Sequence, residues 1–294
     1  MGTTPQEIPA LAGLTVGDVM GTGFASCFPD DDLATVASRL VRDGVHAAVL
    51  TPLYRGTPRI VTDVDLIRAA LSGTGQEVAS DITRGPAVSL PRDAPAADAV
   101  AVMAERYARR LLVIDPGTRV PIGLVSGLDL VAPLGGIHHR LAGVPGPATV
   151  GPPPDTRSLT DAKVGDVAHR SILTCGAGVP LSVIARTMVE HRVHCVAVAG
   201  IKHPDEHLIW GLIEDIDLVE AIHRDALSES AASIAVSPPV AVEATGSLAR
   251  AAELMLEHDA SHLVVVGPTG FPVGVVSTLD VVTVLAAGAV ASLH

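Results

Sequence analysis

The chain has 294 residues, of which 48% are hydrophobic and only 2% aromatic, and its formal net charge is −12 at pH 7. This length and apolar content suit one large domain or two ordinary ones, with cores built from aliphatic side chains. The acidic balance, with Lys163 and Lys202 as the only lysines, excludes a nucleic-acid-binding surface, which needs an excess of Lys and Arg on one face.

Cysteine usage and hydropathy indicate the compartment. The 3 cysteines are an odd number without metal-type spacing, so no disulfide framework is expected. The first residues, MGTTPQEIPALAG, lack the basic and then apolar pattern of a signal peptide. The late apolar run over 281–293 is too short for a bilayer span. We therefore expect a cytoplasmic protein that does not enter a membrane.

The first repeat unit follows a loose N-terminus (1–13) and extends over about 14–72. LTVGDVM predicts a short helical lead-in, and FASCFPDDD predicts a strand and a turn in which Asp30 to Asp32 cap a helix. Gly44 ends this helix, and HAAVLTP and PRIVT form a hairpin before a closing helix over 65–71. The predicted unit is β-α-β-β-α.

The same order of elements recurs three more times along the chain. The second unit (about 78–134) has a helix over 96–107, the hairpin RLLVID and VPIGLVS, and a last helix that Pro133 cuts short. Residues 135–160 have the Gly- and Pro-rich composition of a linker. The third unit (about 161–226) has helices over 181–191 and 217–223, and the fourth (about 231–290) has helices over 248–258 and from Asp280.

One phrase closes the hairpin of every unit: RIVTDVDL, IGLVSGLDL, WGLIEDIDL and VGVVSTLDV. An apolar strand ends in a polar residue, and an Asp follows three positions later. The polar residues are Thr62, Ser126, Glu214 and Ser277, and the acids are Asp65, Asp129, Asp217 and Asp280. The steps between the acids are 64, 88 and 63 residues, so the units form two tandem pairs, 14–134 and 161–294.

The lead-ins VGDVM and VGDVA, the strands that end in Val or Ile, and the closing S/T-x-x-D resemble the CBS (cystathionine-β-synthase) domain, in four copies over nearly all of 14–290. The resemblance implies an α/β fold in which four β-α-β-β-α repeats pack as two pseudo-twofold pairs, or Bateman modules, that form a flat disc. It also implies a regulatory protein and no enzyme, and no catalytic or metal-binding fingerprint occurs in the sequence.

In this family the motif Asp binds the ribose hydroxyls of an adenosine-containing ligand, and the Ser or Thr contacts phosphate. An ionised carboxylate accepts two hydrogen bonds and so suits a vicinal diol, and a hydroxyl at a helix N-terminus suits phosphate. The resemblance thus implies ribose sites at Asp65, Asp129, Asp217 and Asp280 and phosphate contacts at Thr62, Ser126 and Ser277. Glu214 would repel phosphate, so the third site ranks last.

The same S/T-x-x-D pattern is also a helix-capping box, in which the acid reaches back to the residue that caps the helix. This structural interpretation stays open beside ligand binding, and one residue can serve both purposes.

A second set of candidates lies at the start of the hairpin strands: His46, Arg110, His194 and His262. They precede their motif Asp by 19, 19, 23 and 18 residues, which predicts one common place in the unit. In the family, basic residues here face the phosphates of the ligand. A basic residue in all four copies favours an anionic ligand.

These observations predict a sensor that binds AMP, ADP or ATP and signals to an unknown partner protein through a conformational change. S-adenosylmethionine and cyclic di-AMP remain open as ligands, and the protein is expected to be a monomeric disc or a homodimer. The alternative is a structural adaptor that binds no small molecule, in which the motifs only cap helices.

Overall fold

The structure is a computed structural model, and it describes residues 11–22, 24–51, 57–72, 76–135, 157–169, 172–202 and 208–291. Most of the predicted loose N-terminus and of the predicted linker lies outside these residues. The chain divides into two compact units, which are described separately: unit 1 comprises 1–23, 88–171 and 240–294, and unit 2 comprises 24–87 and 172–239.

Each of the four repeats contains one three-stranded sheet with the same topology. The first strand pairs in parallel with the second, which pairs antiparallel with the third. The predicted hairpins are thus confirmed. The strands are β1 (Ala25–Cys27), β2 (Ala47–Leu50) and β3 (Ile60–Thr62); β4 (Ser89–Pro91), β5 (Arg110–Ile114) and β6 (Pro121–Ser126); β7 (Thr174–Gly176), β8 (Cys195–Lys202) and β9 (Leu208–Glu214); and β10 (Ala241–Glu243), β11 (His262–Val266) and β12 (Pro272–Ser277).

Each sheet is accompanied by a helix after its first strand and a helix after its third, as predicted. The helices of the repeats are α2 (Leu33–Asp43), α3 (Asp63–Ser72), α5 (Ala96–Arg106), α6 (Gly127–Val131), α9 (Leu181–His191), α10 (Asp215–His223), α11 (Leu248–Glu257) and α12 (Thr278–Ala291). Short helices come before the first strands, namely α1 (Val16–Val19), α4 (Ala79–Ile82), α8 (Val164–Val167) and the 3-10 turn Ala231–Ser233. Another 3-10 turn (Ala132–Gly135) follows α6, where Pro133 stops the helix.

Local chemistry explains where α2 begins and ends. Asp32 is its N-cap and accepts a hydrogen bond from the Thr35 amide at 2.7 Å, which satisfies one of the free donors of the first turn. Gly44 ends the helix in the left-handed conformation, with φ 61°. Both residues act as the sequence predicted.

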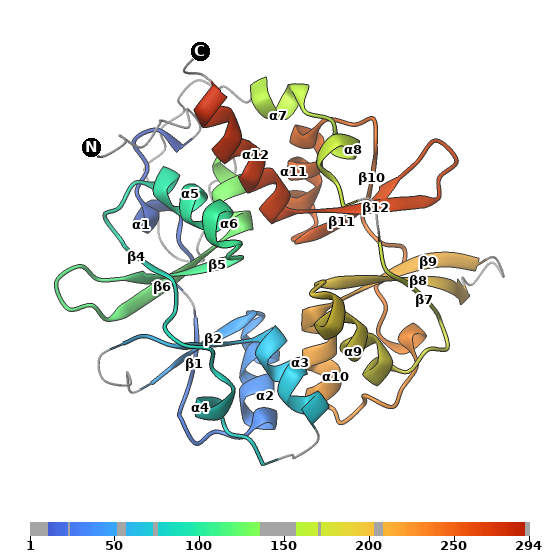
Figure 1. Cartoon of the computed structure of the whole chain (residues 1–294), viewed down its shortest axis with the longest axis horizontal. Helices are drawn as coiled ribbons and strands as arrows, with labels where there is room; N and C mark the ends of the chain where they lie inside the picture. Colours follow the sequence, from blue (N-terminus) through green and yellow to red (C-terminus); the bar gives the residue numbers. More distant parts are fainter. Residues whose placement is uncertain are drawn as a thin grey trace. The chain divides into compact units, whose positions relative to one another are not determined.

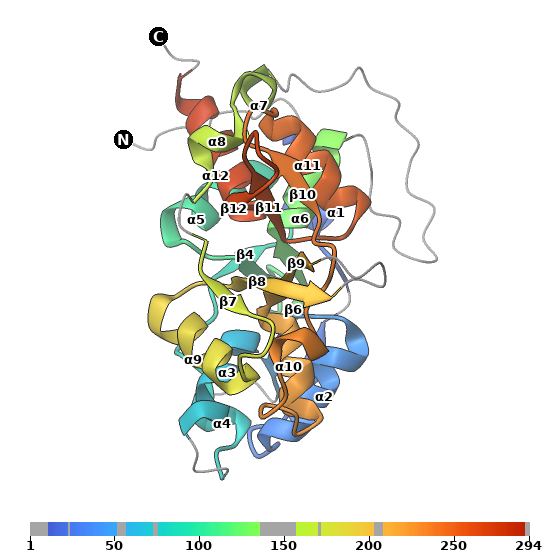
Figure 2. The same ribbon diagram turned by 90° about the vertical axis from the view of Figure 1, so that its right-hand side faces the viewer.

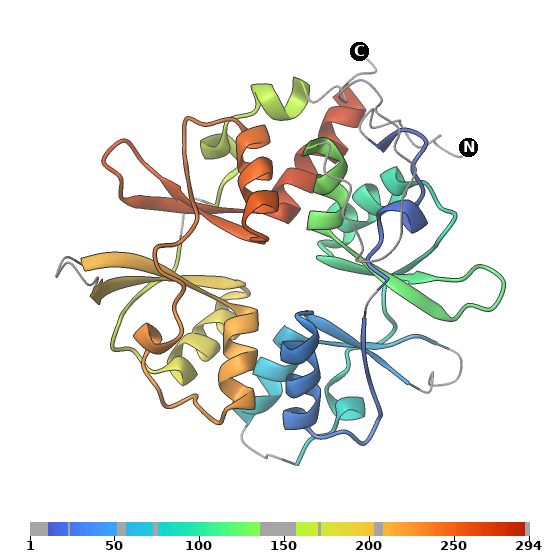
Figure 3. The same ribbon diagram turned by 180° about the vertical axis from the view of Figure 1, so that it is seen from behind.

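Alternate repeats share their apolar cores. The core of unit 1 joins repeats 2 and 4, where α12 packs on α5 and α6 and α11 packs on α6 (Figure 1). The core of unit 2 joins repeats 1 and 3, where α10 packs on α2 and α3 and α3 packs on α9 (Figure 3). A single repeat has one small apolar helix face, so it buries that face against another repeat.

The short lead-in helix of each repeat packs in the core of the unit that contains the other repeat of its tandem pair. Val16 of α1 is fully buried in the core of unit 1, beside repeat 2, and Ala79 of α4 is fully buried in the core of unit 2, beside repeat 1. Val164 of α8 lies in the core of unit 1, near β10 and β12 (Figure 2), and Ala231 lies in the core of unit 2. Consecutive repeats therefore exchange lead-ins.

One helix occurs where the sequence predicted only linker. Helix α7 (Arg157–Asp161) comes at the end of the Gly- and Pro-rich stretch, and its Leu159 is 1% exposed in the core of unit 1. Five residues are too few to show a helical period, so the sequence alone did not predict this turn, which the tertiary burial of Leu159 stabilises.

Within the part of the chain that the structure describes, no helix has both the length and the apolar character needed to cross a bilayer.

A glycine permits close packing between the motif helices of unit 1. A Cβ atom at Gly127 would lie 2.6 Å from Thr278 Oγ1 and 2.8 Å from Thr278 Cβ. We expect Gly127→Ala to lower the free energy of unfolding by about 1–3 kcal/mol, because the helices must move apart. Urea denaturation measures this, with Gly176→Ala as the control, since nothing lies within 4 Å of a Cβ there. Equal losses in the two variants would contradict the expectation.

Candidate functional site

In repeats 2 and 4 the motif residues form complete capping boxes at the junction between the third strand and the last helix. The backbone N–H and the hydroxyl of Ser126 both donate to Asp129 Oδ2, at 2.7 Å each, and the Asp129 N–H returns to Ser126 Oγ at 3.4 Å. Ser277 and Asp280 repeat the same three distances. The motif helices begin at Gly127 and Thr278, directly after the Ser that caps them.

Repeat 1 has the same box with Thr62. The Thr62 hydroxyl and backbone N–H donate to Asp65 Oδ2 at 2.6 and 3.0 Å. The helix α3 begins at Asp63, two residues before the predicted start. In repeats 1, 2 and 4 the cap therefore holds the motif carboxylate through Oδ2, and Oδ1 takes no part in it.

Among the described residues, basic side chains lie beside the second carboxylate oxygen of the motif Asp in repeats 1 and 4. Asp65 Oδ1 lies 3.5 Å from Arg68 Nη1 and 3.9 Å from Arg84 Nε. Asp280 Oδ1 lies 3.3 Å from His169 Nε2. None of these three basic residues was predicted from the sequence to lie beside a motif. Arg68 could have been found, since it is one turn after Asp65, but Arg84 and His169 come from the exchanged lead-ins and only the fold brings them to the motifs.

The lead-in residue that bridges to the fourth motif strand is basic, namely His169, whereas the equivalent residues at the second and third motifs are not. His169, Gly21 and Val236 each bridge to the residue two places before a motif residue, namely Val275, Leu124 and Leu212. These three lead-in positions are thus structurally equivalent, and only one of them carries a basic side chain. The motifs of different repeats therefore offer different charges to a ligand.

The third motif is chemically distinct. The Glu214 N–H donates to Asp217 Oδ2 at 2.7 Å, but the residue that caps the helix carries a carboxylate where the other repeats carry a hydroxyl. Burial, reinforced by the charge of Glu214, raises the pKa of Asp217 from 3.8 to about 7. Asp217 therefore carries a proton about half of the time at neutral pH, unlike an ordinary aspartate.

The four basic residues at the start of the hairpin strands do not occupy one common position in the repeat. The prediction that they do was wrong by one residue in two of the repeats. Arg110 pairs with Ser126 and His262 with Ser277 across their hairpins. In the other two repeats the partners of the motif residues are Ala47 and Cys195, which follow His46 and His194. The prediction rested on the number of residues between each basic residue and its motif Asp. This number depends on the length of the hairpin loop, which differs between repeats, so it does not determine the strand register. A shift of one residue turns a strand side chain to the other face of the sheet.

His46 and His194 instead contact acids that the sequence analysis did not single out. His46 Nδ1 lies 3.0 Å from Asp63 Oδ2, and His194 Nδ1 lies 2.8 Å from Asp215 Oδ2. In unit 1, His262 Nε2 lies 2.8 Å from Arg109 Nη2. The four basic residues thus divide into two pairs with different surroundings. Their roles in ligand binding stay a prediction.

Comparison with known proteins agrees with this architecture. The sequence matches the CBS domain family in four segments, 16–72, 79–135, 164–224 and 231–287. The fold is similar to that of protein MJ1225 from Methanocaldococcus jannaschii, a proposed archaeal homologue of g-AMPK, with TM-score 0.69 and 14% identity over 92% of this chain and 99% of that one. It is also similar to an uncharacterized conserved protein from Pyrococcus horikoshii, with TM-score 0.55 and 14% identity over 92% of this chain and 100% of that one.

No curated protein matches the sequence. The four matched segments correspond to the four repeats of the structure and together cover most of the chain. The four sheets share one topology, and each repeat places a capped acidic motif at the same junction of strand and helix. The chain therefore belongs to the CBS domain family and contains four CBS domains.

Proposed function

We propose that the protein is a non-enzymatic regulator that binds an adenosine-containing ligand at its motif aspartates. The observation that supports this most is that the two oxygens of the motif carboxylate differ in repeats 1, 2 and 4. Oδ2 accepts the hydrogen bonds of the helix cap, and Oδ1 takes no part in the cap. The cap fixes the carboxylate in place before any ligand arrives. An acceptor that is already held in position binds a ribose diol at a lower entropic cost.

The charges near the motifs favour AMP, ADP or ATP over the other candidate ligands. Arg68 and Arg84 lie beside Asp65, and His169 lies beside Asp280. Arg110 and His262 pair with the motif serines of repeats 2 and 4. The arginines attract phosphate and repel the sulfonium of S-adenosylmethionine, and a histidine does the same when it is protonated. Cyclic di-AMP is also anionic, so we rank it below the adenine nucleotides and above S-adenosylmethionine as a ligand.

The motifs are not expected to bind equally well. In the third repeat, Glu214 repels phosphate and Asp217 is partly protonated at neutral pH because its pKa is about 7. A protonated carboxyl is a weaker acceptor for a diol. We rank the third site last.

The signal is proposed to pass to a partner protein, or to a second copy of this chain, through the arrangement of the repeats. A ligand shifts such an arrangement only by its different affinity for the two states. In this proposal the nucleotide stabilises one arrangement, and the partner binds that arrangement preferentially. The monomeric disc and the homodimer are both compatible with this mechanism.

The second candidate function is that of a structural adaptor, and the helix caps formed by the motif Asp residues favour it. Every motif Asp accepts the backbone N–H of the residue three places earlier. A helix cap alone therefore accounts for an Asp at each of these positions. In that case the four domains would form a scaffold without a ligand.

Isothermal titration calorimetry of protein free of co-purified nucleotide distinguishes the two candidates. We expect AMP, ADP or ATP to bind with a dissociation constant on the order of micromolar, at no more than three sites, and S-adenosylmethionine to bind more weakly. The fluorescence of Trp210, on the strand that leads to Glu214, reports the third site in parallel. If the folded protein binds none of the nucleotides, S-adenosylmethionine or cyclic di-AMP, the adaptor is the better description.

A further inference from the structure

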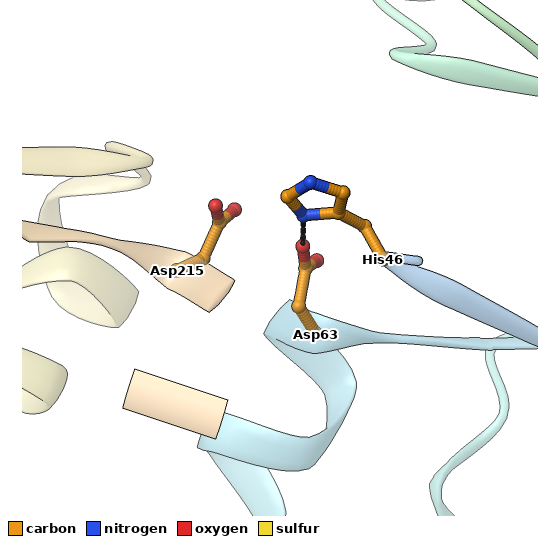
Figure 4. A group of neighbouring side chains, drawn as sticks. All are labelled: His46, Asp63 and Asp215. Atoms are coloured by element: carbon orange, nitrogen blue, oxygen red, sulfur yellow. Dashed lines mark hydrogen bonds and ion pairs between the residues drawn. The ribbon is translucent and has the colours of Figure 1, made fainter. Parts of the chain in front are cut away.

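A cluster of one histidine and two buried aspartates lies where α3 and α10 begin in unit 2. His46, Asp63 and Asp215 each offer a ligand atom, and these atoms all lie within 4.8 Å of one another. Figure 4 shows both carboxylates directed toward the imidazole ring. Asp63 and Asp215 are each 3% exposed, while the His46 side chain is 24% exposed.

His194 and Asp215 form a second histidine–aspartate pair of the same kind in repeat 3. The Asp63 N–H donates to the His46 carbonyl at 3.1 Å, and the Asp215 N–H donates to the His194 carbonyl at 3.2 Å. His194 Nδ1 then lies 2.8 Å from Asp215 Oδ2, as His46 Nδ1 lies 3.0 Å from Asp63 Oδ2. Repeats 1 and 3 thus each supply the same His–Asp pair, and the carboxylates of the two pairs lie close together.

The fold does not require these acids. In unit 1 the equivalent helix starts carry Gly127 and Thr278, and a Cβ at Gly127 would lie 2.6 Å from Thr278 Oγ1. The two motif helices therefore come together in that unit with small, uncharged side chains. Unit 2 places two buried acidic side chains close together at the corresponding point.

We propose that His46, Asp63 and Asp215 bind one divalent transition-metal ion of the zinc class. Imidazole nitrogen and carboxylate oxygen are ligands that Zn²⁺, Co²⁺ and Mn²⁺ accept. A dication offsets both buried carboxylates and leaves the imidazole neutral, as metal ligation requires. The remaining exposure of the His46 side chain, 24%, gives the ion a route from solvent.

The geometry needs only a small adjustment to bind such an ion. Ligand atoms at about 2.1 Å from the metal lie roughly 3.4 Å apart in a tetrahedral site and up to about 4.2 Å apart in an octahedral one. The three ligand atoms already lie within 4.8 Å of one another, so a small rotation of the side chains brings them into this range. The ion would link repeat 1 to repeat 3 within unit 2, independently of any nucleotide.

No metal site was predicted from the sequence, because these residues carry no recognisable spacing. Asp63 and Asp215 each follow a motif residue directly, in repeats that are far apart in the chain. Only the pairing of α3 with α10 brings the two acids together.

Metal titration of the full-length chain, stripped with a chelator and free of nucleotide, tests the proposal. We expect Zn²⁺ to bind at one equivalent and raise the melting temperature, and Co²⁺ to give the visible absorption of a protein site with nitrogen and oxygen ligands. Asp215→Asn should weaken binding by more than about 100-fold, since even changes next to a metal ligand cost roughly 10–100-fold. His46→Gln, at a partly exposed position that tolerates change better, should weaken binding by at least about tenfold. His194→Gln, which removes the contact that holds the Asp215 carboxylate, should also weaken binding.

The matched control is His223→Gln, which removes an exposed histidine at the end of α10 and should leave the affinity and the thermal shift unchanged. Binding without a one-equivalent endpoint, or equal affinity in wild type and in His46→Gln, would overturn the proposal. An effect of His223→Gln as large as that of His46→Gln would overturn it too. Because no nucleotide is present, the result does not depend on the proposed nucleotide sites.

Discussion

Replacing Asp217 by Asn is expected to stabilise the protein at pH 8 by up to about 4 kcal/mol and to change its stability little at pH 4. In the folded protein the pKa of Asp217 is about 7, against an ordinary 3.8. The folded state thus keeps the proton over a range of pH in which the unfolded chain has released it. The free energy of unfolding therefore falls as pH rises from about 4 to about 7 and is level above that.

Asparagine suits this test because it is neutral at every pH and its Oδ1 can still accept the Glu214 N–H that Asp217 accepts now. The variant should lose the decline of stability between pH 4 and 7, and Glu214→Ser should lose part of it, because Glu214 is a contributor secondary to burial. Urea denaturation across this range of pH measures both. The control is Glu229→Gln, which removes an exposed negative charge from the same unit. An Asp217→Asn profile parallel to that of wild type would show that burial does not disfavour the charge.

Asp280→Asn is expected to abolish nucleotide binding at the fourth site while leaving the cap of α12 largely intact. The Asn Oδ1 can accept the Ser277 hydrogen bonds that Asp280 Oδ2 accepts at 2.7 Å. Its amide group donates where the second carboxylate oxygen accepted, so the ribose diol meets a donor in place of an acceptor. Two hydrogen bonds to a charged acceptor contribute roughly 1.5–3 kcal/mol each, so the affinity should fall by at least about 100-fold.

The chain offers a matched control in helix α1. Thr15 and Asp18 form the same capping box, with Asp18 Oδ2 accepting from the Thr15 N–H at 2.8 Å and from its hydroxyl at 2.7 Å, but they lie outside the motif. Asp18→Asn should match Asp280→Asn in its stability cost, of about 1 kcal/mol or less, and should leave nucleotide binding unchanged. Calorimetric titration and thermal unfolding report the two effects separately. If both variants bind nucleotide as wild type does, the motif Asp is only a cap.

The sequence predicted those parts of the fold that local patterns determine. The four copies of β-α-β-β-α follow from hydrophobic periodicity, and the ends of α2 follow from Asp32 and Gly44. The helix α9 was predicted with both of its ends. In each case neighbours within a few residues decide the conformation, so the pattern can be read along the chain.

Features that depend on distant contacts were not predicted. The register of His46 and His194 depends on hairpin geometry, which a count of loop residues does not determine. The approach of Asp63 to Asp215 and of His169 to Asp280 depends on how repeats pack and exchange lead-ins. Helix α7 is stabilised by the burial of Leu159, for which five residues give no period. The capping boxes were predicted, but a cap and a ribose site use the same residues, so the pattern could not separate them.

The exchange of lead-ins sets an order for folding during synthesis on the ribosome. The core of unit 2 ends at Ala231, so its residues have all emerged while the last repeat is still being translated. The core of unit 1 extends from Leu11 to Leu285, and it cannot close before almost the whole chain is made. Until then the apolar faces of α1 and α5 stay exposed, a condition that favours chaperone binding or aggregation. Premature termination inside the last repeat would therefore leave the core of unit 2 complete and deprive unit 1 of part of its core.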